Sequence, residues 1–273
     1  MSGRTIIITG ASDGIGAQAA RQLVASGEHV VLVGRSPEKT RAVAAELGAP
    51  YHLADFTRLD DVRALASALG AYARIDVLMN NAGGVMGPRE TTTDGFEKTL
   101  QVNHLAPFLL TNLLIDRLTA SRSVVLNTSS AANQVFSRLD LTDLELTRGY
   151  TPNRAYGNAK LANILFTREL HRRYHPQGLS TAAFHPGTVA TNFASESSSL
   201  MRLIYRTPLR HLLLITPQQG TDTMLWLANG TPGVDWQPGQ YYDRRNIGMV
   251  HPIADNPVLT QMLWDQSAQM VGL

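Results

Sequence analysis

Two residues in the segment AYGNAKLAN (155–163) have the types and the spacing for proton transfer: Tyr156 and Lys160. On a helix, positions four residues apart lie on the same face, so the phenol and the ammonium can share one site. A free tyrosine has a pKa near ~10 and exchanges protons poorly at neutral pH. A neighbouring cation favours the phenolate and lowers this pKa, which suits general acid–base catalysis. The pair therefore predicts proton-transfer chemistry, and the alternative is that the spacing is a coincidence.

A second candidate site is the glycine-rich segment TGASDGIG (9–16), which lies between an apolar predicted strand (4–10) and a predicted helix (about 15–26). Glycines allow the backbone to turn sharply and to approach a pyrophosphate at the positive end of the helix dipole. The three glycines of this segment are Gly10, Gly14 and Gly16. A plain tight turn is the alternative, but the position after the first strand favours dinucleotide binding. The sequence has no GxxxxGK[ST] motif, which disfavours a P-loop for nucleoside triphosphates.

The end of the second predicted strand, HVVLVG (29–34), bears on the choice of dinucleotide. Strands at this position that end in Asp or Glu bind the ribose hydroxyls of NAD. Arg35 follows this strand instead, and its planar guanidinium can hold the 2′-phosphate of NADP, so we expect NADP in preference to NAD. A solvated surface arginine is the alternative, and Asp13 would repel a phosphate if it faced the same way. Asp55, after the third strand, is a candidate acceptor for the adenine amino group, a residue of the next helix start, or both.

The elements that must position these residues alternate between strands and helices through the first half of the chain. Ser36 and Gly48 predict the bounds of a second helix, and Thr57 is expected to cap the third. Further strands are expected at 75–80 and 123–129, with a long helix from about Thr93 to Leu118 between them. Continuous apolar strands between helices indicate a parallel sheet that is covered on both faces. The chain is therefore expected to have an α/β fold, a doubly wound Rossmann-type domain.

The helix of the tyrosine–lysine pair is expected to end near Tyr174, and LSTAAFHPG (179–187) predicts another buried strand. Residues 190–215 mix serines, arginines and short apolar runs without a period, which is more typical of a substrate lid than of structureless filler. Their basic, amphipathic part (201–214) gives contact with a membrane surface as the alternative. The later predicted elements are a helix at about 217–227, a strand near 240–242 and a helix after Asn256. No internal repeat or linker is present, so residues 1–273 are predicted to form a single domain.

Composition excludes several classes of function. The chain has 273 residues, of which 44% are hydrophobic and 17% charged, as is typical of a soluble globular protein. Its net charge is +2 without a block of like charges, so nucleic-acid binding is not expected. The absence of cysteine excludes thiolate metal sites and cysteine nucleophiles, and suits a reducing compartment. The first strand starts almost at once, so neither a signal peptide nor a transmembrane segment is expected, and a cytoplasmic location is predicted.

Together, these residues resemble the short-chain dehydrogenase/reductase family over nearly the whole chain. The matching motifs are the glycine turn, NNAG (80–83), Asn103 in QVNH, SS (129–130), the Tyr156–Lys160 pair and HPGT (185–188). Within the family, the chain is most similar to the retinol-dehydrogenase-like branch. This closer resemblance is carried by DGFE (94–97), VNHLAPFLLTNLL (102–114), AKLANILFTREL (159–170), HPGTV (185–189) and TPQQG (216–220).

The resemblance implies catalytic roles for four residues. Tyr156 would protonate the carbonyl oxygen as hydride arrives, or take the alcohol proton in the reverse direction. Lys160 would lower the pKa of Tyr156 and hold the nicotinamide ribose. Ser130 would hydrogen-bond the substrate oxygen and stabilise its developing charge, with Ser129 as a structural hydroxyl at the strand end. Asn103 would hold, through its amide and backbone, a water that links Lys160 to solvent.

The resemblance also implies a cofactor site around the ends of the strands. NNAG would pass beside the adenine-side ribose, and the residues of HPGT and the valine after it would border the nicotinamide. The expected cofactor-binding residues are Gly10, Ser12, Asp13, Gly14, Ile15, Gly16, Arg35, Asp55, Phe56, Asn81, Ala82, Gly83, Tyr156, Lys160, Pro186, Gly187, Thr188 and Val189.

The leading hypothesis is an NADP(H)-dependent oxidoreductase that interconverts a hydrophobic alcohol and its aldehyde or ketone. A nucleotide-sensing regulator on the same fold is one alternative, but it would not need the four catalytic residues together. A sugar-nucleotide epimerase is another, but such relatives usually have a different glycine spacing and a larger carboxy-terminal domain. No metal site is expected, because His171 and His175 near a helix end more often complement the helix dipole. A homo-oligomer is compatible with the sequence, which does not determine the oligomeric state.

Overall fold

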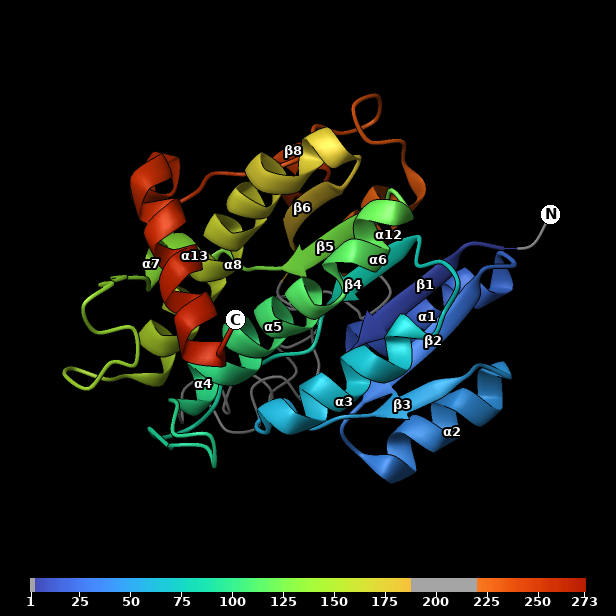
Figure 1. Ribbon diagram of the computed structural model, residues 1–273, viewed down its shortest axis with the longest axis horizontal. Helices are drawn as coiled ribbons and strands as arrows, with labels where there is room; N and C mark the ends of the chain where they lie inside the picture. Colours follow the sequence, from blue (N-terminus) through green and yellow to red (C-terminus); the bar gives the residue numbers. More distant parts are fainter. Residues whose placement is uncertain (1–2, 188–219) are drawn as a thin grey trace, which may run out of the picture.

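Residues 3–187 and 220–273 are described by the computed structural model of the chain, and within them eight strands form one sheet (Figure 1). Their order across the sheet is β3-β2-β1-β4-β5-β6-β7-β8. Neighbouring strands pair in parallel, except β7 and β8, which pair antiparallel. The strands are β1 (Thr5–Thr9), β2 (His29–Gly34), β3 (Tyr51–Leu53), β4 (Val77–Asn80), β5 (Val124–Thr128), β6 (Ser180–His185), β7 (Tyr241–Asp243) and β8 (Asn246–Ile247).

Helices cover both faces of this sheet, which confirms the predicted doubly wound α/β fold (Figure 1). One layer contains α3 (Leu59–Gly70), α5 (Ala106–Leu113), α8 (Pro152–Tyr174) and α13 (Pro257–Val271). The other layer contains α1 (Gly14–Ala25), α2 (Pro37–Leu47) and α12 (Asp222–Asn229). Shorter helical segments are α4 (Lys98–Leu100), the π-helical turn η1 (Gln101–Leu105), α6 (Ile115–Ala120), α7 (Ala132–Val135), η2 (His175–Gln177) and η4 (Pro252–Asp255). The predicted segment 190–215 lies outside the described residues, and the single domain over 1–273 stays a prediction.

The two layers of helices pack on opposite faces of the same strands. In β1, Ile7 packs with the layer of α3, α5, α8 and α13, whereas Ile6 and Ile8 pack with the layer of α1, α2 and α12. All three side chains are completely buried. This arrangement follows from the period of a strand, in which successive side chains point to opposite faces.

The helix α13 closes the first of these layers over α5 and α8. It begins after Asn256, as predicted, because the side-chain oxygen of Asn256 accepts the first free backbone N–H groups of the helix. The indole of Trp264 in α13 lies 5.0 Å from the ring of Phe108 in α5 and 5.7 Å from the ring of Phe166 in α8. These aromatic contacts tie the last helix to the middle of the chain.

The order of the strands places the ends of several strands at one edge. The strand order reverses at β1, since β2 lies on one side of it and β4 on the other. In an open parallel sheet, ligands bind beyond the carboxyl ends of the strands at such a point. The residues that directly follow β1, β2, β4, β5 and β6 are Gly10, Arg35, Asn81, Ser129 and Pro186. The sheet therefore brings the glycine turn, the loop NNAG and the serine pair to the same edge.

The prediction that Thr57 caps the third helix is wrong. The helix α3 begins at Leu59, and the residue before it, Arg58, makes no side-chain cap bond. The N–H and the hydroxyl of Thr57 donate instead to Oδ1 of Asp55, at 3.0 and 2.9 Å. The N–H of Leu59 donates to Oδ2 of Asp94 at 2.8 Å. A local turn therefore holds Thr57 outside the helix, and a carboxylate distant in sequence satisfies the first helical turn.

The single long helix expected from Thr93 to Leu118 is also wrong. The helical segment begins at Lys98, after a cap from the carboxylate of Glu97, and then changes to the π-helical turn η1. Pro107 accounts for this turn. It has no N–H, so the carbonyl of Asn103, four residues earlier, has no α-helical partner.

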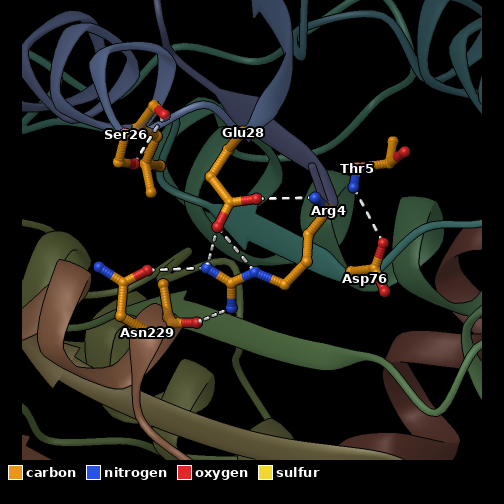
Figure 2. Close-up of polar contacts among 8 residues, drawn as sticks. Arg4, Thr5, Ser26, Glu28, Asp76 and Asn229 are labelled. Atoms are coloured by element: carbon orange, nitrogen blue, oxygen red, sulfur yellow. Dashed lines mark hydrogen bonds and ion pairs between the residues drawn. The ribbon is translucent and has the colours of Figure 1, made fainter. Parts of the chain in front are cut away.

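Arg4 joins the start of β1 to the end of α12 (Figure 2). Its Nε and Nη2 donate to Oε1 of Glu28 at 2.9 and 2.5 Å, and its backbone N–H donates to Oε2 of the same carboxylate at 2.7 Å. Its Nη1 donates to the carbonyl oxygen of Ala228 at 2.6 Å, and Nη2 donates to Oδ1 of Asn229 at 2.8 Å. The Glu28 side chain is 16% exposed and the Arg4 side chain 36%, so the carboxylate is the better shielded partner of this ion pair.

Replacing Glu28 by Ala should lower the free energy of unfolding by about 1.5–3 kcal/mol, because it removes a largely buried carboxylate that accepts three hydrogen bonds from Arg4. The exposed pair of Arg21 and Glu46 provides the matched control, and Glu46→Ala should cost less because water screens that pair. Urea unfolding of both variants measures the difference. Equal losses would show that the Arg4 contacts add nothing beyond an ordinary surface pair.

Candidate active site

A cleft of about 280 Å³ lies beyond the carboxyl ends of β1, β2 and β4. Of the predicted cofactor-binding residues, it is lined by Gly10, Ser12, Arg35, Asp55, Phe56, Ala82 and Gly83. Residues that were not predicted also line it: Val33, Gly34, Ala54, Gly84, Val85, Met86, Lys98 and Val102. Val85 and Met86, which follow NNAG closely, are apolar, and this pattern indicates that the loop continues along the cleft. No local pattern indicates Lys98, which lies within the helix expected from Thr93 to Leu118.

The glycine turn is packed too tightly for side chains. Gly10 has a φ of +68°, and a Cβ there would lie 2.9 Å from Cα of Ala82. A Cβ on Gly16 would lie 2.3 Å from the carbonyl oxygen of Gly10. Asn81 fastens the turn, because its Nδ2 donates to the carbonyl oxygen of Thr9 at 2.9 Å. The amide of Asn81 is therefore directed at the end of β1.

Asp13 and Arg35 are charged residues that follow the ends of β1 and β2. Asp13 accepts the N–H of Gly14 at 2.8 Å and pairs with Nζ of Lys39, also at 2.8 Å, so it caps α1 and has a cation beside it. Gly14 and Ile15 form the first turn of α1. Arg35 lines the cleft and is exposed. Its side chain makes no hydrogen bond or ion pair within the described part of the chain.

Asp55 and Phe56 line the cleft from the loop after β3. Oδ1 of Asp55 is occupied by the two hydrogen bonds from Thr57, so this residue builds the turn that precedes α3. Phe56 is buried, and its carbonyl oxygen accepts a hydrogen bond from Nε2 of Gln101 at 3.2 Å. The loop is thereby tied to η1.

The tyrosine–lysine pair lies on α8, as the spacing predicted. Thr151 caps the helix, and Tyr156 and Lys160 are both buried, with 7% and 1% of their surface exposed. Nζ of Lys160 lies 5.4 Å from the centroid of the Tyr156 ring and donates to the carbonyl oxygen of Thr128 at 3.1 Å. A Cβ on Gly83 would lie 3.3 Å from the same Nζ. The loop after β4, the end of β5 and α8 therefore meet at the lysine.

Burial changes the proton affinity of Lys160. Removing the ammonium from water disfavours its charged form. Burial accordingly lowers the pKa of Lys160 to about 7 in the cofactor-free protein. The side chain can thus gain or lose a proton near neutral pH.

The two serines after β5 have different surroundings. Ser129 is completely buried, and its Oγ donates to the carbonyl oxygen of Lys160 at 2.7 Å. Ser130 is partly exposed, and its Oγ accepts the N–H of Ala132 at 3.2 Å. Of the two hydroxyls, that of Ser130 still has its hydrogen to donate to a ligand.

Asn103 is completely buried in η1. Its Oδ1 accepts the N–H of Gly84 at 3.0 Å, and its Nδ2 donates to the carbonyl oxygens of Gly84 and Thr99 at 3.0 and 2.9 Å. The amide therefore holds the loop after β4 against η1. Because both Nδ2 hydrogens are used, a water could bind only to oxygen atoms of this residue.

Pro186 and Gly187 follow β6 and are partly buried, and Gly187 has a φ of +86°. The predicted cofactor residues Thr188 and Val189 lie outside the described residues. In residues 3–187 and 220–273, no group of three or more His, Asp or Glu side chains is arranged to hold a metal ion. The helices in these same ranges include none with the length and apolar character needed to cross a membrane.

Comparisons with known proteins agree with this geometry. The sequence matches the family model of the short chain dehydrogenases over residues 4–201. It is 41% identical over 280 residues to the "Putative daunorubicin C-13 ketoreductase DnrU" of Streptomyces sp. (strain C5), with 100% of this chain and 94% of that protein covered. It is 36% identical over 282 residues to human retinol dehydrogenase 11, with 100% and 87% covered.

A similar solved structure is that of a protein from Mycobacterium paratuberculosis. It aligns with a TM-score of 0.79 at 32% identity and covers 98% of this chain and 93% of its own. The family model matches residues 4–201, and the relatives and the solved structure agree over nearly the full length. The chain is an oxidoreductase that belongs to the short-chain dehydrogenase/reductase family, in its retinol-dehydrogenase-like branch.

Proposed function

We propose that this chain is an NADP(H)-dependent oxidoreductase that interconverts a hydrophobic alcohol and its aldehyde or ketone. The observation that carries the proposal is the buried pair of Tyr156 and Lys160, at the same sheet edge as the glycine turn. Proteins of this family bind NAD or NADP.

The residues at the cleft fit a nicotinamide dinucleotide. Gly10 and Gly16 allow the turn to pack closely against the loop after β4, and the turn leads into α1, whose positive end suits a pyrophosphate. Arg35 supplies a guanidinium without a protein partner in the described residues, which suits the 2′-phosphate of NADP. Ala82 and Gly83 would border the adenine-side ribose. When bound, the dinucleotide supplies or accepts the hydride.

The chain's own residues would handle the proton. Oη of Tyr156 would donate to the carbonyl oxygen in reduction and remove the hydroxyl proton in oxidation. Lys160, in its charged form, favours the phenolate and would also hold the nicotinamide ribose. Oγ of Ser130 would donate to the substrate oxygen and stabilise the charge that develops there. Ser129 cannot take this role while it donates to the carbonyl oxygen of Lys160.

Apolar side chains near Ser130 support a hydrophobic substrate. Val135 and Phe136, in and directly after α7, are 62% and 44% exposed, so two adjacent apolar side chains face outward in the segment that follows Ser130. A Cβ on Gly157, next to Tyr156, would lie 2.8 Å from the backbone nitrogen of Ser137, so this segment packs close to the tyrosine. The names of the two relatives, a ketoreductase and a retinol dehydrogenase, point to carbonyl and alcohol chemistry.

Replacing Arg35 by Asp should weaken NADPH binding by roughly 10- to 150-fold, because the variant loses a charge-assisted contact of about 1.5–3 kcal/mol. NADH binding should change far less, since NADH lacks the 2′-phosphate. Dissociation constants of both dinucleotides for the wild type and the variant measure the effect. Equal or tighter binding of NADH by the wild type would contradict the choice of NADP.

Replacing Tyr156 by Phe should lower turnover by about 10²–10⁴, because only the hydroxyl that transfers the proton is lost. The melting temperature and the dissociation constant for NADPH should stay close to those of the wild type. Turnover of NADPH with a panel of hydrophobic aldehydes and ketones is the measurement. A folded variant with near-normal turnover would end the proposed mechanism.

The lowered pKa of Lys160 makes stability depend on pH. Between about 7 and ~10.4 the unfolded chain binds more protons at this position than the folded chain, so the folding stability contributed by Lys160 rises with pH. Lys160→Met removes this dependence. In cofactor-free protein, the stability of the variant relative to the wild type should therefore fall by on the order of 3–5 kcal/mol from pH 6.5 to pH 10. Urea unfolding of both proteins across this pH range measures the difference. If their free energies of unfolding change in parallel with pH, the amine is not shielded from water.

A further inference from the structure

Three buried polar side chains outside the proposed catalytic set link α13 to the surroundings of Lys160: Ser267, His104 and Asn163, which are 0%, 1% and 4% exposed. Oγ of Ser267 lies 2.9 Å from Nε2 of His104, and Nδ1 of His104 lies 3.3 Å from Oδ1 of Asn163. Nδ2 of Asn163 then donates to the carbonyl oxygens of Asn103 and Thr128, at 3.0 and 3.1 Å. We refer to Ser267, His104 and Asn163 as the polar bridge.

The direction of each hydrogen bond in the polar bridge follows from the chemistry of its groups. Asn163 uses both Nδ2 hydrogens on carbonyl oxygens, so its Oδ1 can only accept. Nδ1 of His104 must therefore carry a proton and donate it, which leaves Nε2 to accept from the hydroxyl of Ser267. Burial, to which the charge of Lys160 adds, lowers the pKa of His104 to about 4, so the imidazole is neutral at neutral pH.

One of the two carbonyl groups that accept hydrogen bonds from Asn163 also accepts one from Lys160. The oxygen of Thr128 also accepts from Nζ of Lys160 at 3.1 Å, so Asn163 fixes the acceptor that the lysine uses. The oxygen of Asn103 lacks an α-helical partner because Pro107 has no N–H, and Asn163 takes that place. Asn163 thereby ties the end of β5 and the turn η1 to the helix that carries the lysine.

We propose that the polar bridge positions the lysine: Asn163 and His104, anchored on α13 by Ser267, keep the end of β5 and η1 in the arrangement that Lys160 needs for turnover. This inference rests on the proposed function, because it requires Lys160 to act in the reaction. The bridge moves no proton, since each group in it is committed as a donor or an acceptor. A displacement of about 1 Å at a positioned group can lower a rate by about 10². Loss of the bridge should therefore reduce turnover far more than cofactor binding.

The first test is Asn163→Leu, which keeps a similar volume and removes the two donors. We expect kcat to fall about 10- to 100-fold, while the dissociation constant for NADPH stays within about threefold, below the tenfold change that 1.4 kcal/mol would produce. Thr181→Val is the matched control: Thr181 is completely buried, and its hydroxyl donates to the carbonyl oxygen of Thr167 in α8 at 3.0 Å, so it makes none of the hydrogen bonds of the bridge. The control should lose stability but keep kcat. Wild-type kcat in a folded Asn163→Leu variant would overturn the proposal.

A second test does not depend on the folding of the Asn163 variant. His104→Asn keeps an N–H donor at the position of Nδ1, whereas His104→Leu removes it, so the Asn variant should retain most of the kcat that the Leu variant loses. Nitrogen-15 NMR of the wild type should find the His104 proton on Nδ1 and not on Nε2. A proton on Nε2, or equal kcat in the two His104 variants, would overturn the proposal.

Lys160→Met separates this inference from the proposed function. If Lys160→Met keeps wild-type turnover, the proposed function fails and the inference fails with it. If Lys160→Met is inactive while folded Asn163→Leu and His104→Leu turn over like the wild type, only the positioning role fails. Loss of turnover in all three variants, with NADPH binding retained in the Asn163 and His104 variants, supports both.

Discussion

A lysine amine buried from water needs hydrogen-bond acceptors inside the protein, and the carbonyl oxygen of Thr128 supplies one to Lys160. The carbonyl group of Thr128 is turned toward Nζ because β5 ends there, directly before the two serines. The nearby amide of Asn103 also demands that Gly83 have no side chain, because a Cβ there would lie 2.4 Å from Oδ1 of Asn103. The parallel sheet is what makes these contacts coincide, since it delivers the ends of β4 and β5 to the same edge.

The parts of the site that could be predicted from the sequence depend on local chemistry. The four-residue spacing of Tyr156 and Lys160 needs only the period of a helix, and α8 supplies it. The glycine turn and the strand ends follow from the apolar runs and from the need for Gly10 to adopt a positive φ. The convergence of these segments then follows from one rule, that the carboxyl ends of parallel strands form the ligand-binding edge. The fold class and the family could therefore be predicted from the sequence.

The parts that could not be predicted depend on contacts between distant residues. Threonine is a common N-cap residue, but Thr57 does not cap α3. The N–H of Leu59 in its first turn donates instead to Asp94, which lies 35 residues later in the chain. The bond between His104 and Ser267 joins residues that are 163 positions apart, and no local pattern indicates it. Pro107 was a local signal for the break at η1, but its effect on the carbonyl of Asn103 matters only because Asn163 lies opposite it.

The position of α13 in the chain has a consequence for biosynthesis. It is the last described helix to leave the ribosome, although it covers Phe108 and Phe166, which are made much earlier. Until Trp264 has been synthesised, Phe108 and Phe166 lack this partner, and apolar surface that is exposed during folding promotes aggregation. The hydrogen bond from Ser267 to His104 can form only in the same late event, so the polar bridge beside Lys160 is completed after the rest of its surroundings have been synthesised.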